Sequence, residues 1–307
     1  MKSIHRSLTH IKKERMPFDV RSLENHFIND YLRFYGINDQ EVTYSHGYVS
    51  FHDENHFVQW FQPTSIKGTV LLVHGYFDHA AALSKTINYL LKQNYAVLTY
   101  DLQGHGLSTG NRAHINQFKE YVVFLEYLLT IMDDRIQKPL HVVAHSTGCA
   151  IVASYMMTNS CPFQKVIFIS PLVRSYRWHV SKVGFYLLFP FIKEMKRMFK
   201  GNSSNTKYLQ FVKEDPLQPQ KLPLSWLKAL IQWNNQVDTF QSVSHPLLIV
   251  QGKKDKTVDW RYNLKVLKEK FPHCHIQMIR KGKHQLLNEQ EKIQKDVHEI
   301  IERYLLS

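Results

Sequence analysis

Apolar residues follow two alternating patterns along this chain. Six short apolar runs are rich in Val, Ile and Leu and lie at residues 69–75, 95–101, 140–146, 165–170, 246–252 and 275–281. Such runs predict strands that are buried on both faces, as in a parallel sheet. Segments with helical periodicity separate the first four runs, at residues 81–93, 118–133 and 149–158. This alternation predicts βαβ units and therefore an α/β fold, a mostly parallel sheet with helices on both faces.

Other parts of the chain break this rhythm. Apolar residues from Leu23 to Tyr35 recur at four-residue steps and predict a helix, and residues 42–51 and 57–61 predict a β-hairpin. Residues 171–244 contain no clear sheet strand. We therefore predict a core formed by residues 1–170 and 245–307, and a helical cap inserted at residues 171–244, called the insert below.

Composition limits the class of protein. The chain has 307 residues, of which 44% are hydrophobic, enough to bury a large core without disulfide or metal staples. Three unevenly spaced cysteines, Cys149, Cys161 and Cys274, predict neither a disulfide framework nor a zinc site and favour a reducing compartment. The basic N-terminus lacks the apolar region of a secretory signal, and no apolar stretch approaches the roughly 20 residues of a spanning helix. We expect a cytoplasmic protein, with peripheral membrane contact left open.

A candidate nucleophile stands between a predicted strand and a predicted helix. Ser146 lies in the sequence Ala144-His145-Ser146-Thr147-Gly148, directly after the apolar run that begins at Leu140. A strand, a sharp turn and a helix around a serine form a nucleophile elbow, which needs small residues two positions before and after the serine. Ala144 and Gly148 meet this requirement, although Ala144 departs by one methyl group from the usual glycine.

A serine nucleophile needs a histidine base and a carboxylate that orients the base. In this architecture the chain order is serine, acid, histidine, with the acid and the histidine following the last two strands. Asp255 and His284 stand at these places, three residues after Gly252 and four residues after Arg280, respectively. Asp259 is an alternative acid further from its strand, whereas His273 and His275 precede or lie within the last strand.

Acyl transfer also needs amide groups that stabilise a negatively charged oxygen. One amide is expected from Thr147, which follows the nucleophile. The loop after the first long strand, His74-Gly75-Tyr76, is expected to supply the second through the backbone N–H of Tyr76. These two amides form the predicted oxyanion hole.

Taken together, the motifs resemble the α/β-hydrolase superfamily, in particular its lysophospholipases and monoacylglycerol lipases. The resemblance rests on ordered segments between residues 70 and 290: His74-Gly75, Asp101 to Ser108, Ala144 to Gly148, Asp215-Pro216-Leu217 with Ser225-Trp226, Gly252 with Asp255, and Gly282 with His284. It implies an α/β-hydrolase fold with a lid, a Ser146–His284–Asp255 triad and no cofactor. Glycine-rich phosphate loops and clustered metal ligands are absent from the sequence, so neither nucleotide nor metal is expected.

The charge of the chain is concentrated in the insert. The chain has 39 Lys and Arg against 26 Asp and Glu, a net +13, and residues 174–213 contribute nine basic residues against one acidic residue. Aromatic residues are interleaved with these charges, a pattern typical of a helix in the headgroup region of an anionic membrane. The candidate residues that face substrate or membrane are Trp178, Phe185, Phe189, Phe191, Lys193, Lys196 and Arg197. Simple packing of the insert on the core is the plain alternative, and no nucleic-acid-binding module is present.

These observations predict a serine hydrolase that cleaves a lipid carboxylic ester, a lysophospholipid or a monoacylglycerol, at an anionic membrane surface. A short-chain carboxylesterase, an acyltransferase or a peptidase of the same fold remains open, because the triad is common to all of them. A non-catalytic hydrolase-fold protein that binds lipid or a protein partner is the alternative from another class. The sequence leaves the oligomeric state open.

Overall fold

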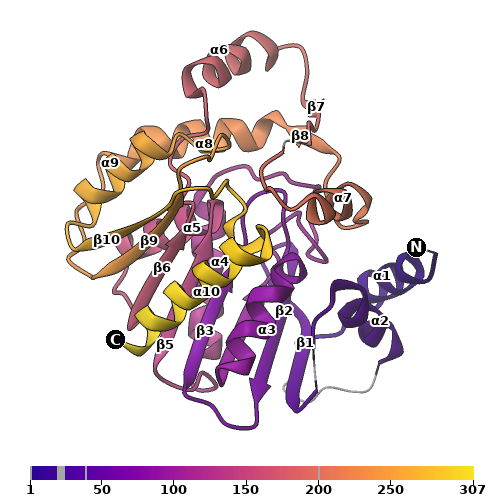
Figure 1. Ribbon diagram of the computed structural model, residues 1–307. Coiled ribbons are helices and arrows are strands. Elements are labelled where there is room, and N and C mark those ends of the chain that lie inside the picture. The colour runs from indigo at the N-terminus through magenta and orange to yellow at the C-terminus, as the bar shows by residue number, and fades with distance from the viewer. Residues whose placement is uncertain (1, 19–24, 39, 200) are drawn as a thin grey trace.

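One eight-stranded sheet forms the centre of the protein. The computed structural model describes residues 2–18, 25–38, 40–199 and 201–307. The strands lie in the order β1-β2-β4-β3-β5-β6-β9-β10 (Figure 1). β1 is antiparallel to β2 and β2 to β4, whereas all other neighbours are parallel. These strands are β1 (Val42–Phe51), β2 (Glu54–Pro63), β3 (Gly68–Val73), β4 (Tyr95–Tyr100), β5 (Leu140–His145), β6 (Lys165–Ile169), β9 (Leu247–Gly252) and β10 (Cys274–Ile279). The predicted mostly parallel α/β sheet is confirmed.

Helices cover both faces of the sheet and divide the core into two apolar clusters. In β3, Leu71 and Val73 belong to one cluster, whereas Val70 and Leu72 belong to the other, as alternate positions of a doubly buried strand must. Helices α4, α5, α8 and α9 pack into the first cluster, and α1, α2, α3 and α10 pack into the second. Their bounds are α1 (Lys2–Glu14), α2 (His26–Tyr35), η1 (Ala80–Leu83), α3 (Ser84–Lys92), α4 (Lys119–Met132), α5 (Thr147–Thr158), α8 (Leu224–Val237), α9 (Trp260–Lys270), η2 (Leu286–Asn288) and α10 (Glu291–Leu306).

The N-terminal predictions fall partly outside the described residues. The predicted helix from Leu23 to Tyr35 corresponds to α2, which begins at His26, while Leu23 is not described. Helix α1 was not predicted, although Ile4, Leu8 and Ile11 form its buried stripe. Its charged residues gave that segment the appearance of a basic tail. No helix in the described part of the chain has the length and apolar character needed to cross a bilayer.

The insert contains α6 (Trp178–Leu188), α7 (Thr206–Glu214), α8 and a small ribbon of β7 (Glu194–Lys196) paired with β8 (Lys221–Pro223). These elements lie beyond the edge of the sheet at which β5 ends and α5 begins (Figure 1). Helix α6 projects furthest from the body of the molecule (Figure 1). Three-residue strands are too short for a period-two pattern to be recognised, so the sequence did not reveal the ribbon. The division into core and cap stays a prediction.

Candidate active site

Ser146 occupies a strained turn between β5 and α5. Its backbone has φ 52° and ψ −112°, a region that residues other than glycine rarely adopt and that costs about 1–3 kcal/mol. Two backbone hydrogen bonds hold the turn: the Ser146 N–H donates to Ile169 O at 3.0 Å, and the Leu172 N–H donates to Ser146 O at 3.2 Å. Such a turn presents the serine side chain at the carboxyl end of the sheet.

The residues around the turn are small because backbone approaches them closely. A Cβ atom added to Gly148 would lie 2.6 Å from Val73 O, and one added to Gly75 would lie 3.0 Å from Ser146 Cβ. Neither position has room for a side chain. Ala144 is completely buried, so its methyl group is accommodated where the usual motif has glycine.

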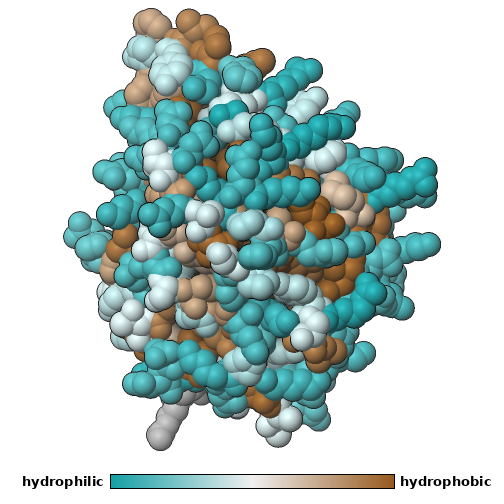
Figure 2. All heavy atoms as spheres, turned by 90° about the vertical axis from the view of Figure 1, so that its left-hand side faces the viewer, coloured by the Kyte–Doolittle hydropathy of each residue, from teal (hydrophilic) through white to brown (hydrophobic). Residues whose placement is uncertain are grey.

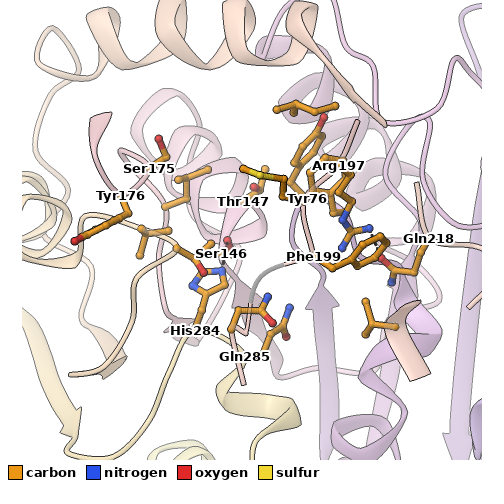
Figure 3. A pocket seen from close by; sticks show the side chains of 18 of the residues that line it. Tyr76, Ser146, Thr147, Ser175, Tyr176, Arg197, Phe199, Gln218, His284 and Gln285 are labelled. Carbon is orange, nitrogen blue, oxygen red and sulfur yellow. Dashed lines mark hydrogen bonds between the residues drawn. The ribbon is translucent and has the colours of Figure 1, made fainter. Parts of the chain in front are cut away.

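His284 links Ser146 to Asp255. Its Nε2 lies 3.0 Å from Ser146 Oγ (Figure 3), and its Nδ1 lies 2.8 Å from Asp255 Oδ2. The carboxylate accepts the Nδ1–H, which leaves Nε2 free to accept the serine hydroxyl proton. The three side chains that were predicted from the sequence as nucleophile, base and acid therefore form one hydrogen-bonded chain.

Asp255 is held in its ionised form. Burial alone would raise the pKa of this carboxyl, but the charge and hydrogen bond of His284 and the amides of Thr257 and Val258 outweigh burial and lower it. These amides donate to Asp255 Oδ1 at 2.7 and 3.2 Å. An ionised carboxylate can stabilise the imidazolium that forms when His284 takes a proton.

The alternative partners lie elsewhere. Asp259 caps the first turn of α9, where its carboxylate accepts the Tyr262 N–H at 3.5 Å. His273 and His275 are exposed, just before and within β10. The structure therefore brings only Asp255, of the two candidate acids, to His284.

The backbone N–H groups of Tyr76 and Thr147 are the predicted donors of an oxyanion hole. Tyr76 and Thr147 both line the cavity that contains Ser146. Within the described residues, their amides have no acceptor. Thr147 is the first residue of α5, where N–H groups lack intrahelical partners and the helix dipole favours negative charge. The Tyr76 ring, stacked on Trp226 with centroids 3.6 Å apart, holds its loop in place.

Two buried histidines support this geometry, and sequence reasoning assigned no role to either. His74 donates from Nδ1 to Gly75 O at 2.8 Å and accepts the Leu102 N–H at Nε2 at 2.9 Å. His145 donates from Nε2 to the carbonyl of His284 at 3.2 Å. Burial lowers the pKa of both to about 3, so they act as neutral groups. In the sequence, the one feature that could have drawn attention to them is that His74 precedes Gly75 and His145 precedes Ser146.

A cavity of about 380 Å³ opens onto Ser146 and His284. This volume lies within the roughly 300–1,000 Å³ typical of small-molecule sites. Elements of the insert form much of its wall, and the apolar part of the lining includes Leu172, Val212, Leu222, Trp226, Leu227 and Leu230. The cavity can therefore place an apolar chain beside the serine hydroxyl.

The seven candidate residues of the insert lie in three different environments. Trp178 and Phe185 are buried in the core cluster and do not line the cavity, so the expectation that they face substrate or membrane does not match their positions. Arg197 lines the cavity. The remaining candidates are exposed: Phe189, Phe191, Lys193 and Lys196. Aromatic composition alone did not distinguish a side chain that anchors α6 from one that faces solvent.

No cluster of three or more His, Cys, Asp or Glu side chains in the described part of the chain is arranged to hold a metal ion.

Comparisons with known proteins identify the family and the fold of this chain. The family model described as "Serine aminopeptidase, S33" (Hydrolase_4) matches residues 64–291. A monoacylglycerol lipase from Mycolicibacterium smegmatis is 27% identical over 65% of this chain and 74% of its own length. A probable lysophospholipase L2 from Haemophilus influenzae is 22% identical over 80% of this chain and 86% of its own length.

A solved structure shows the same fold. The soluble variant of monoglyceride lipase from Saccharomyces cerevisiae, in complex with a substrate analogue, superposes with a TM-score of 0.75 at 18% identity. The match covers 88% of this chain and 97% of that one. This likeness confirms the fold that the sequence motifs predicted.

Proposed function

Because the chain belongs to the Hydrolase_4 family of α/β hydrolases, we propose that it cleaves the carboxylic ester of a lysophospholipid or monoacylglycerol. The coarser statement, that it is a serine hydrolase of the esterase and lipase group, follows from the family and its relatives. The observation that carries the finer proposal is the hydrogen-bonded chain from Ser146 through His284 to Asp255 at the wall of a largely apolar cavity.

In the proposed reaction, Ser146 Oγ attacks the ester carbonyl while His284 Nε2 takes its proton. The amides of Tyr76 and Thr147 stabilise the oxyanion, and each such donor contributes roughly 3–4 kcal/mol to the transition state. His284 then protonates the departing alcohol, leaving the acyl group on the serine. Asp255 stabilises the imidazolium throughout. Water, activated by the same histidine, hydrolyses the acyl-enzyme and releases the fatty acid.

A membrane surface is the proposed source of substrate. The α6 region ends in exposed apolar side chains, which we call the α6 tip: Val180, Val183, Tyr186, Leu187, Leu188, Phe189, Phe191 and Ile192. Hydrophobic side chains gather at the top of the molecule, where α6 projects (Figure 2). Lysines such as Lys193 and Lys196 flank the tip. This combination fits insertion among anionic headgroups, with the insert acting as the cap that admits single acyl chains.

Replacement of Ser146 tests the catalytic assignment. S146A should lower kcat for a chromogenic acyl ester by about 10⁶-fold, because no other group replaces the nucleophile. The variant should also lose labelling by a fluorophosphonate probe, which reacts only with an activated serine. S65A, which changes an exposed serine, is the control and should keep both properties. Circular dichroism checks that the fold is intact.

Other outcomes identify the alternatives. Unchanged activity in S146A refutes the nucleophile, and a wild type that is not labelled indicates a non-catalytic binding protein. A panel of acetyl to oleoyl esters, with monoacylglycerols, lysophospholipids and an aminoacyl amide, separates the remaining classes. Preference for short soluble esters or for the amide, which the family description would suggest, contradicts the lipid proposal. Acyl transfer to an added alcohol in place of water identifies an acyltransferase.

A further inference from the structure

Arg197 is a cation inside the wall of the candidate active site. It is the first residue after β7, and its side chain is partly buried and lines the same cavity as Ser146. The guanidinium carbon lies 4.3 Å from the ring centroid of Phe77 and 4.5 Å from that of Phe199. These two rings fix the plane of the guanidinium, so its donors are preorganised.

The guanidinium is only partly satisfied by the protein. Its Nη1 donates to Gln218 Oε1 at 2.6 Å and to Pro219 O at 3.0 Å. Among the described residues, Nε and Nη2 have no hydrogen-bond acceptor. Arginine carries five N–H donors in a planar fork that matches phosphate or carboxylate. Arg197 therefore retains donors for an anion.

Among the described residues, no carboxylate forms an ion pair or hydrogen bond with Arg197. Asp78 and Asp215 act on it only at longer range. Burial raises the pKa of Asp78, which favours its neutral form. Asp215 is engaged by His79 at 2.7 Å and by the Tyr35 hydroxyl at 2.7 Å. A partly buried cation without a direct counterion gains most from an anionic ligand.

The wall of the cavity has one sign of charge. Arg197 and Lys213 are its cationic side chains, and no Asp or Glu is among the described residues that line it. In Figure 3, Arg197, Phe199 and Gln218 lie together to one side of Ser146, and Tyr176 lies to the other. A substrate held at Ser146 by its ester thus meets an arginine on one side only.

We propose that Arg197 is a specificity-determining residue that binds the phosphate of a lysophospholipid headgroup, so that the enzyme prefers anionic lysophospholipids to neutral monoacylglycerols. This proposal rests on the ester hydrolase function above and selects between its two substrates. The glycerol backbone separates the ester from the phosphate, so a substrate whose ester lies at Ser146 extends its headgroup toward Arg197. The acyl chain follows the apolar part of the cavity.

The test compares two soluble esters that differ only in the phosphate, 1-octanoylglycerol and 1-octanoylglycerol 3-phosphate, used as monomers so that membrane binding plays no part. R197Q should lower kcat/KM for the phosphate ester by about 30-fold or more, mainly through KM, because a desolvated charge pair is lost. The same variant should change kcat/KM for the neutral ester by less than about threefold. R197K, which keeps the charge but not the fork, should fall between R197Q and wild type.

K207Q is the matched control. Lys207 belongs to the same insert, is exposed and does not line the cavity. The substitution should therefore cause only a small change in kcat/KM, of the same size for both esters. Equal losses on both esters in R197Q would show a merely structural role for Arg197 and would overturn the proposal. So would no loss on either ester, or a wild-type preference for the neutral one. If wild type hydrolyses neither ester and is not labelled by a fluorophosphonate, the proposed function itself fails.

Inhibition experiments distinguish a headgroup from free phosphate. With the neutral ester as substrate, sn-glycerol 3-phosphate should inhibit wild type competitively and R197Q much less, whereas glycerol should inhibit neither appreciably. Inorganic phosphate should inhibit more weakly than glycerol phosphate, since it lacks the glycerol contacts near Ser146. Stronger inhibition by inorganic phosphate would indicate an effector site for the free ion and would overturn the assignment to a substrate headgroup.

Discussion

Asp255 and Asp259 are four residues apart and differ in what surrounds each carboxylate. Asp255 accepts two loop amides and faces His284, so its negative charge lies beside an imidazole. The Asp259 carboxylate instead accepts a backbone N–H in the first turn of α9. Distance from the strand end already favoured Asp255 in the sequence, but the direction of each side chain depends on the turn between them. The function proposed for Asp255 therefore rests on local backbone geometry.

The variant D255N tests this assignment. The asparagine can still accept the amides of Thr257 and Val258, but its NH₂ group faces His284 Nδ1 and forces the proton onto Nε2. That tautomer cannot accept the proton of Ser146. We expect kcat for an acyl ester to fall by about 10³–10⁴-fold with little change in stability. Steady-state kinetics and thermal unfolding measure the two quantities.

D259N is the control for this variant, because asparagine caps a helix about as well as aspartate. It should retain wild-type kcat. If D259N lost activity to the same extent as D255N, or if D255N remained active, the carboxylate that orients His284 would have to be sought elsewhere.

At the scale of elements, a buried pair joins the insert to the core. His79, just before η1, lies with its Nε2 2.7 Å from Oδ2 of Asp215, which follows α7 in the insert. Both side chains are completely buried, and Tyr35 at the end of α2 donates to the other carboxylate oxygen. Burial opposes the charged forms, yet the pair raises the pKa of His79 and lowers that of Asp215. Three distant segments therefore meet at one charge pair.

This pair predicts a pH-dependent stability. Because the pKa of His79 is raised in the folded state, its charged-pair stabilisation is complete below the unfolded value of 6.5 and is lost as pH rises through the folded pKa. H79Q should therefore lower the free energy of unfolding most at about pH 5.5, by about 3–5 kcal/mol. The difference from wild type should shrink as the pH rises through the raised pKa of folded His79. Denaturant unfolding at a series of pH values from about 5.5 upward measures it.

H298Q is a control for which we expect the opposite dependence of stability on pH. Burial lowers the pKa of His298 to about 4, so the neutral form is favoured in the folded protein. Wild type then loses stability at this site as pH falls below 6.5, and the cost of H298Q should diminish in acid. Parallel pH trends for the two variants would mean that neither local pKa governs the difference.

At the scale of the whole molecule, apolar side chains are exposed unevenly. Phe191 is 85% exposed and Leu187 is 66% exposed, and both belong to the α6 tip. Elsewhere, Leu306 is 62% exposed near the C-terminus, which lies away from α6 (Figure 1). A cluster of exposed apolar residues is costly in water and fits a surface that contacts lipid. The insert therefore has two sides, one lining the cavity and one directed outward.

The variant F191D tests the outward side. Placing a carboxylate at the α6 tip removes apolar burial and adds repulsion from anionic lipid, so binding to phosphatidylserine vesicles should weaken roughly tenfold or more. Hydrolysis of a soluble acyl ester should be unchanged. Vesicle co-sedimentation and ester kinetics measure the two effects. L306D, the matched control, should bind vesicles as wild type does, and equal weakening in both variants would contradict a docking role for the tip.

The sequence by itself determined the features that depend on local order. Strands β3 to β6 were predicted because each is a continuous apolar run with a helix between neighbours, and Ser146 stood out because it joins such a run to a helix. Asp255 and His284 could be nominated because their places in the chain are set by the strands before them. The charged amphipathic helix α1 was not predicted. Its few apolar residues can be recognised as a buried face only when the segment that packs against them is known.

Only the tertiary structure decided which side chains meet. It separated Trp178 and Phe185, the buried residues of α6, from Phe191, which is exposed, although all three belong to one aromatic segment. It placed Arg197 in the cavity wall and paired His79 with Asp215 across 136 residues of chain. Burial, charge pairing and shape depend on distances between residues remote in sequence, and no local pattern contains those distances.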